Sequence, residues 1–189
     1  MNDMAMPAEQ RSELMTAEDL ELVRIPGKAT ELVRGRLVVR EPPGTYHGII
    51  QSRLHLLVGE YVRAHRLGEV CGQDTGFKIA SNPDTVRGPD VAFIRADRVS
   101  GIARRGYAPL APDLIVEVLS PDDRRGEVLA KIGEWLDAGV RLAWVVDPER
   151  REAHVYRPDG SVSVLEASGT LDGEDVLPGF AGSLSEVFE

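Results

Sequence analysis

Two acidic residues stand where an ionised side chain is costly. Asp90 precedes the apolar run at residues 91–94, and Glu117 lies within residues 114–119, where every other residue is large and apolar. An apolar run of this length, bounded by prolines, is typical of a strand that is buried on both faces. Because a buried carboxylate loses its hydration, Glu117 requires a cationic partner, which could be a lysine, an arginine or a metal ion.

A lysine on a predicted helix completes the set. Lys131 lies three residues after Val128 and four before Trp135, so it is on the flank of the apolar stripe of that helix. Its aliphatic stem can be buried while its ammonium group extends into a pocket. There the ammonium could hold an attacking water or stabilise negative charge on a phosphate.

The two carboxylates share a role if their strands are neighbours. Asp90 and Glu117 would then face one pocket, and their repulsion would raise the pKa of each. A divalent cation removes that cost, and Mg²⁺ in proteins is typically held by one or two carboxylates with waters and a substrate phosphate. The pattern therefore indicates metal-assisted hydrolysis of a phosphate ester, in which the metal polarises a phosphoryl oxygen and generates hydroxide.

Each of these residues also fits an ordinary structural role. Asp90 could cap a strand or a turn, and Lys131 could be a surface lysine with a buried stem. Glu117 could pair with an arginine, for which Arg87 and Arg124 are the candidates. The three residues together favour the catalytic interpretation more than each does alone.

Two further polar residues could approach the same pocket. Glu31 lies at the end of one arm of a predicted hairpin, and His47 lies in the first turn of a long predicted helix. His47 could bind a phosphate or a metal, or it could be a capping or packed histidine, and Glu31 could be an ordinary strand charge. Ser120 lacks the glycine-flanked elbow of serine hydrolases, and the sequence has no Gly-rich phosphate loop.

The elements that must position these residues follow from apolar periodicity and turn residues. Thr16 and Asp19 form a capping box, Asp122 and Asp123 are candidate caps of the helix that carries Lys131, and Gly139 can end that helix. The pattern predicts helices over 16–24, 46–65 and from about 124 to 138, and a hairpin over 31–39 around an Arg-Gly turn. It predicts strands over 69–71, 76–80, 113–119, 141–146, 152–157 and 162–166, and an apolar strand that Asp90 starts within the stretch 86–94.

Composition places the chain among globular proteins. Its 189 residues are enough for one domain with a real core, and no apolar run approaches the ~20 residues of a membrane helix. Cys71 is the only cysteine, which excludes an internal disulfide and suits a reducing cytoplasm. A net charge of -9 argues against broad attraction to nucleic acid but not against a local basic strip. We expect a flexible tail over 1–15 and one mixed α/β domain over 16–189, with a sheet flanked by helices.

The motifs resemble a known family over nearly the whole chain. The similarity lies in GPDVAF at 88–93, PDLIVEVLSP at 112–121, Lys131 and WVVDP at 144–148, together with the hairpin that begins at Glu31, His47 and LPGF at 177–180. This combination resembles the Uma-type endonucleases of the restriction-endonuclease-like PD-(D/E)xK superfamily.

The resemblance implies a restriction-endonuclease-like core and Mg²⁺-dependent hydrolysis of phosphodiester bonds in DNA. It implies that Asp90, Glu117 and the backbone carbonyl of Val118 bind the metal, for which Mn²⁺ could substitute. The lysine of the superfamily belongs two residues after the acid, where this chain has Leu119. The family resembled moves the lysine onto the following helix, and Lys131 fits that position.

The remaining expectations concern supporting residues and partners. The resemblance implies that Glu31 and His47 support the metal ligands or contact the substrate. A homodimer would cut both strands of DNA by two-fold symmetry, with the hairpin at 152–166 as a candidate interface.

Two alternatives to catalysis remain open. In the first, the chain is an inactive nuclease-fold module that binds nucleic acid or protein, which the acidic composition and Leu119 favour. In the second, it is an interaction module in which Glu117 pairs with an arginine.

Overall fold

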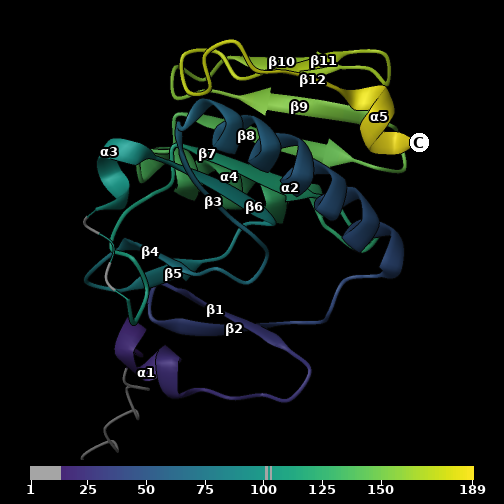
Figure 1. Cartoon of the computed structure of the whole chain (residues 1–189). Coiled ribbons are helices and arrows are strands. Elements are labelled where there is room, and N and C mark those ends of the chain that lie inside the picture. The colour runs from purple at the N-terminus through teal and green to yellow at the C-terminus, as the bar shows by residue number, and fades with distance from the viewer. Residues whose placement is uncertain (1–13, 101, 103) are drawn as a thin grey trace, which may run out of the picture.

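The largest element of the fold is a six-stranded mixed sheet in the order β10-β9-β8-β7-β6-β3. The computed structural model describes residues 14–100, 102 and 104–189, so residues 1–13 of the predicted tail lie outside the described part (Figure 1). The central strands β7 and β8 run parallel, whereas the other neighbouring pairs are antiparallel. The strands are β3 (Gly68–Cys71), β6 (Val91–Arg95), β7 (Leu114–Val118), β8 (Leu142–Asp147), β9 (Glu152–Tyr156) and β10 (Val162–Leu165). The predicted mixed α/β class is confirmed.

One long helix covers each face of this sheet (Figure 1). Helix α2 (Thr45–His65) packs Ile50 and Leu54 against a cluster that includes Val116 of β7. Helix α4 (Arg125–Asp137) packs Trp135 in a second cluster that includes Ile115 of the same strand. Because successive side chains of a strand point to opposite faces, both faces of β7 are apolar and both are buried.

A second, smaller sheet has the order β2-β1-β5-β4, and all its neighbouring strands are antiparallel (Figure 1). Its strands are β1 (Ala29–Val33), β2 (Arg36–Arg40), β4 (Phe77–Ala80) and β5 (Thr85–Arg87). The predicted hairpin is confirmed as β1 and β2, and both of its turn residues, Arg34 and Gly35, have positive φ angles of 50° and 73°. Two positive φ angles are the signature of a tight turn whose twist matches that of the strands.

The apolar strand predicted to start at Asp90 is confirmed as β6, and the residues just before it form a separate strand of the small sheet. β5 ends at Arg87 in the small sheet, and β6 begins at Val91 in the large one. Pro89 lies between them and has no N–H group to donate to a strand ladder, which favours the break. Asp90 is therefore placed at the passage from one sheet to the other.

The helix that carries Lys131 is capped differently from the prediction. Its N-cap is Arg124, which makes no side-chain capping bond. The carboxylate of Asp123 instead accepts a hydrogen bond from the backbone N–H of Ser120 at 2.8 Å, within the preceding turn. The prediction that Asp122 or Asp123 caps this helix is therefore wrong.

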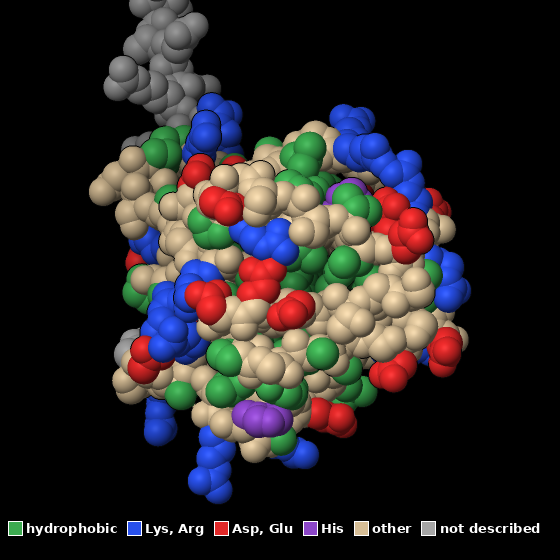
Figure 2. Space-filling model, turned by 90° about the horizontal axis from the view of Figure 1, so that it is seen from above, with side chains coloured by type: hydrophobic (Ala, Val, Ile, Leu, Met, Phe, Trp, Pro, Cys, Tyr) green, Lys and Arg blue, Asp and Glu red, His purple; other side chains and the backbone are tan. Residues whose placement is uncertain are grey.

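The remaining short elements pack around these two sheets. Helix α1 (Ala17–Leu22) begins with the predicted capping box between Thr16 and Asp19, and α3 (Ala96–Val99) follows β6. Strands β11 (Thr170–Asp172) and β12 (Ala181–Ser183) pair with each other, and α5 (Leu184–Phe188) contacts α2. No helix in the described part combines the length and the apolar character that crossing a membrane requires. Seen from above, basic and acidic side chains are interspersed on the surface (Figure 2).

The close approach of β3 to β6 depends on Gly68. Its φ is 155°, and a Cβ atom there would lie 1.9 Å from the carbonyl oxygen of Ile94. We expect Gly68→Ala to lower the free energy of unfolding by roughly 2 kcal/mol or more, measured by urea denaturation. Gly59 inside α2 is the matched control, since a Cβ there meets nothing within 4 Å. Gly59→Ala should be neutral or stabilising by about 0.5–1 kcal/mol, and equal effects of the two changes would show that the close approach at Gly68 is unimportant.

Candidate active site

The pairing of β6 with β7 brings the two predicted acids together. Val91 is the partner of Val116 in this antiparallel ladder, and the backbone N–H of Asp90, just before β6, donates to the Val116 carbonyl at 3.1 Å, next to Glu117. The condition that their strands are neighbours is therefore met.

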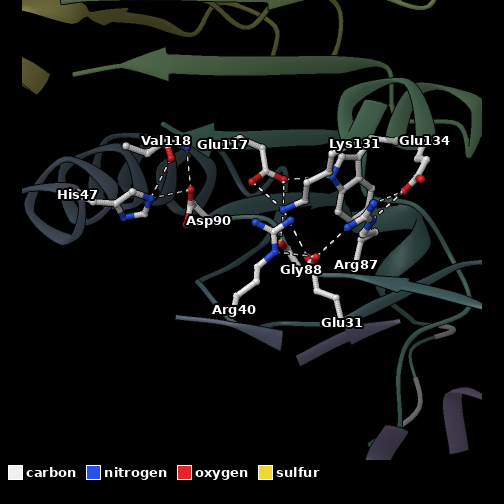
Figure 3. A network of polar contacts seen from close by, with 11 residues as sticks. Glu31, Arg40, His47, Arg87, Gly88, Asp90, Glu117, Val118, Lys131 and Glu134 are labelled. Carbon is white, nitrogen blue, oxygen red and sulfur yellow. Dashed lines mark hydrogen bonds and ion pairs between the residues drawn. The ribbon is translucent and has the colours of Figure 1, made fainter. Parts of the chain in front are cut away.

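The cation beside Glu117 is a lysine. The Nζ atom of Lys131 lies 2.8 Å from Oε1 and 2.9 Å from Oε2 of Glu117 (Figure 3). The indole Nε1 of Trp135 also donates to Oε1, at 3.2 Å. The alternative in which Glu117 pairs with an arginine is wrong, because Arg87 contacts Glu31 and Glu134, and Arg124 contacts Glu127. Lys131 is not a surface lysine either, since its side chain is only 10% exposed.

Burial governs the protonation of this pair. Burial raises the pKa of Glu117 to about 7 although Lys131 attracts the ionised form, and the charge of Asp90 adds to the increase. Burial alone would lower the pKa of Lys131, but the charges of Glu117 and Glu31 outweigh it and raise that pKa. The ammonium is therefore held in its charged form by the carboxylates around it.

Asp90 and His47 meet at the backbone of β7. Oδ2 of Asp90 accepts a hydrogen bond from the N–H of Val118 at 2.7 Å. Nε2 of His47 donates to the carbonyl oxygen of Val118 at 2.9 Å and lies 3.4 Å from Oδ2 of Asp90 (Figure 3). Burial would lower the pKa of His47, but the hydrogen bond and charge of Asp90 raise it. The carbonyl proposed from sequence as a metal ligand is thus bonded to a histidine in this structure.

Glu31 is the acceptor at the centre of a cationic cluster. Its Oε2 accepts from Nη1 of Arg87 at 2.8 Å and from Nε of Arg40 at 3.0 Å, and its Oε1 accepts from the N–H of Gly88 at 3.0 Å. Nζ of Lys131 lies 3.4 Å from Oε1. Burial would raise the pKa of Glu31, but Lys131, Arg40 and Arg87 outweigh it, and the pKa falls to about 2. Glu31 is therefore more than an ordinary strand charge.

Sequence reasoning missed the residues that connect this cluster to α4. Arg87 joins Glu31 in the small sheet to Glu134 in α4, with Nη2 2.7 Å from Oε2 of Glu134. Lys131 donates to the carbonyl oxygen of Gly88 at 3.0 Å. Helical spacing could have identified Trp135, since it lies four residues after Lys131 on the same side of α4. Nothing in the spacing of Arg87 indicated its partners, because they are 56 and 47 residues away.

These residues line a cleft of about 1320 Å³. One wall comes from β1, the end of β2 and residues 41–47, and another comes from residues 117–123, which are the last residues of β7 and the turn that follows it. The lining includes all the candidate residues, which are Glu31, His47, Asp90, Glu117, Val118 and Lys131. Residues that are far apart in the sequence thus meet at one concave surface.

The oxygen donors here are of the kind that a hard divalent cation takes. Asp90 and Glu117 supply two carboxylates, and Mg²⁺ sites commonly use one or two carboxylates with waters and phosphate. No cluster of three His, Cys, Asp or Glu side chains with metal-binding geometry occurs among residues 14–100, 102 and 104–189. The two carboxylates are of the chemical type that Mg²⁺ binds, and an ion would compete with Lys131 for the Glu117 carboxylate.

The depressed pKa of Glu31 predicts how stability depends on pH. A carboxylate with a folded pKa of about 2 and an ordinary value of 4.5 stabilises the folded protein above pH 4.5. That contribution, roughly 3 kcal/mol, is lost as the pH falls from 4.5 towards 2. We expect the unfolding free energies of wild type and Glu31→Gln to differ most near pH 7 and to converge in acid, measured by urea denaturation. A difference that is constant with pH would contradict the assignment.

Comparisons with known proteins agree with this fold. A family model described as "Uma2: Putative restriction endonuclease" matches residues 17–185. A crystal structure described as a "putative nuclease belonging to DUF820" from Anabaena variabilis superposes with a TM-score of 0.79 at 22% identity, covering 92% of this chain and 97% of the other. No curated protein matches the sequence. The predicted restriction-endonuclease-like fold is confirmed, and the chain belongs to the Uma2 family.

Proposed function

We propose that this protein is an endonuclease that hydrolyses phosphodiester bonds in DNA with a divalent metal ion, normally Mg²⁺. The observation that carries the proposal is the convergence of Asp90, just before β6, Glu117 of β7 and Lys131 of α4 at the wall of one cleft. The description of the Uma2 family as restriction endonucleases and of the structural neighbour as a nuclease supports the same reaction class.

The size of the cleft suits a polymer better than a small metabolite. Pockets for small molecules typically measure about 300–1,000 Å³, and this cleft is larger. Its lining is rich in charged side chains, which argues against an apolar ligand. A phosphodiester chain that lies along the cleft would pass the Glu117 carboxylate.

The residues at the site have separable roles in this proposal. Asp90 and Glu117 would hold the metal, with the Val118 carbonyl as a third donor once it is released from His47. The bound metal supplies Lewis acidity and a hydroxide nucleophile. Lys131 orients the Glu117 carboxylate and stabilises negative charge on the phosphate, and Glu31 holds the Lys131 ammonium in place.

Two proposals from the sequence concern the protein in the cell. The homodimer stays a prediction, and β10 is the strand through which we expect it to form, because it lies at the edge of the large sheet with Val162 and Val164 exposed. A cytoplasmic location likewise stays a prediction.

One observation favours a second candidate function. Lys131 and Trp135 already satisfy the Glu117 carboxylate, so the burial of this acid does not by itself require a metal. A nuclease-fold module that binds nucleic acid or protein without cutting it would be built in this way. The acidic net charge of -9 gives it further support.

Substitutions at the site test the catalytic proposal. We expect Glu117→Gln and Lys131→Ala each to reduce Mg²⁺-dependent cleavage of plasmid DNA by at least about 100-fold, because each removes charge from the reacting centre. The control is Glu127→Gln, an exposed residue of the same helix as Lys131, which should cut at the wild-type rate. Melting temperatures identify variants that fail to fold. Full activity in both site variants would refute the assignment.

Metal binding separates the two candidate functions without an activity assay. We expect calorimetry with Mn²⁺ to show a binding heat in wild type that Asp90→Ala abolishes, since half of the carboxylate pair is lost. The second candidate predicts no heat in either protein. It also predicts that Asp90→Ala leaves nucleic-acid binding unchanged.

A further inference from the structure

The cleft is an unfavourable place for a phosphate backbone except at one point. Among the described residues, eight carboxylates and five lysines or arginines line it. The acids are Glu31, Glu41, Asp74, Asp90, Glu117, Asp122, Asp123 and Glu149, and the bases are Arg24, Lys28, Arg40, Arg87 and Lys131. The excess of negative charge repels a polyanion unless particular cations offset it.

Four of these five bases are committed elsewhere. Arg87 and Lys131 are buried and bonded to carboxylates in the interior. Lys28 pairs with Glu41. Nη1 of Arg24 donates to two backbone carbonyls next to α1. The charges of Arg87, Lys131 and Lys28 are therefore offset by carboxylates of the protein, and Arg24 is held by one Nη atom against the end of α1.

Arg40 differs from them in how its guanidinium is held. It is the last residue of β2, and its Nε donates to Oε2 of the buried Glu31 at 3.0 Å. Its side chain is 43% exposed, and within the described part of the chain neither Nη atom has a protein partner. Figure 3 shows the guanidinium turned towards the space in front of the Glu117 carboxylate. One edge of the group is anchored, and the other faces the cleft.

We propose that Arg40 binds a backbone phosphate of the nucleic acid beside Glu117. This inference rests on the proposed function and adds a substrate-binding residue to the acids and the lysine already discussed. The two Nη groups of an arginine form a planar fork that matches two phosphate oxygens. Anchoring Nε to Glu31 fixes the fork before the substrate arrives, which reduces the entropy lost on binding.

The position of Arg40 explains why an arginine serves here. The Nε bond to Glu31 and the Nη bonds to phosphate use different nitrogens of the same group, so both can form at once. A lysine at this position has one charged nitrogen and would have to divide it between Glu31 and the phosphate. Arg40 is also much more exposed than Lys131, whose Nζ atom hydrogen-bonds Glu117 and the Gly88 carbonyl and lies 3.4 Å from Glu31.

The salt dependence of DNA binding tests the proposal. Binding of a short fluorescein-labelled DNA duplex is measured by anisotropy in Ca²⁺, over KCl concentrations from about 50 to about 200 mM. We expect Arg40→Gln to weaken binding by about 10-fold or more at the lower salt and to reduce the slope of log Kd against log salt by about 1. Arg40→Lys should keep the slope, since it keeps the charge, while binding more weakly than wild type. Arg36→Gln is the control, an exposed arginine of the same strand with no ion pair in the described structure, and it should bind as wild type.

The outcomes separate this proposal from the proposed function. An unchanged slope in Arg40→Gln, with wild-type affinity, would overturn the phosphate-binding role even if Glu117→Gln still abolishes cleavage. A loss of affinity that Arg36→Gln shares equally would also overturn it, because it would be a general charge effect. If wild type neither binds nor cuts DNA, the proposed function itself fails. Should Arg40→Gln not fold, the slope and affinity of Arg40→Lys decide, and wild-type affinity in that variant would count against the fork.

Discussion

The structure depends on one buried ion pair, between Glu117 in the central sheet and Lys131 in the helix that covers it. A carboxylate on a strand that is apolar on both faces is tolerated because an ammonium group lies within 2.9 Å of both of its oxygens. Removing either partner takes away the nearest opposite charge from an ionised group in a poorly hydrated place, which is costly. The pair therefore fixes α4 relative to the C-terminal end of β7, where the proposed chemistry would occur.

The passage between the two sheets, at residues 88–90, joins the parts of the site. The Gly88 N–H donates to Glu31 and the Gly88 carbonyl accepts from Lys131, so one peptide segment contacts both the small sheet and α4. Two residues later, Asp90 accepts from the backbone of β7. Because backbone atoms make these contacts, the site is positioned by the course of the chain as much as by its side chains.

The electrostatics of the cleft set requirements on any substrate. Carboxylates outnumber lysines and arginines along its walls, and most of those bases are satisfied within the protein. A polyanion can approach only where bound cations and an anchored arginine offset the field. A catalytic role on a polyanion and a divalent metal are thus linked by charge balance. A module that does not cut would have to bind nucleic acid without that help, or bind protein instead.

Local pattern was enough for most elements and for the identity of the acids. The alternation and periodicity of apolar residues predicted the long helix α2, the hairpin of β1 and β2, and the central strand that carries Glu117, because each pattern is satisfied within a few residues. The capping of α4 was mispredicted because the Asp123 carboxylate accepts a hydrogen bond from the Ser120 N–H, within the preceding turn. Short-range propensity does not decide between that donor and the N–H groups of the helix. The apolar strand that starts after Asp90 was predicted, but its pattern did not show that the residues just before it pair in a different sheet. Only the tertiary structure decided that Lys131, rather than an arginine, neutralises Glu117, and that Arg87 joins Glu31 to Glu134. Those contacts join residues far apart in sequence, and their geometry follows from how the two sheets and α4 pack, which no local pattern encodes.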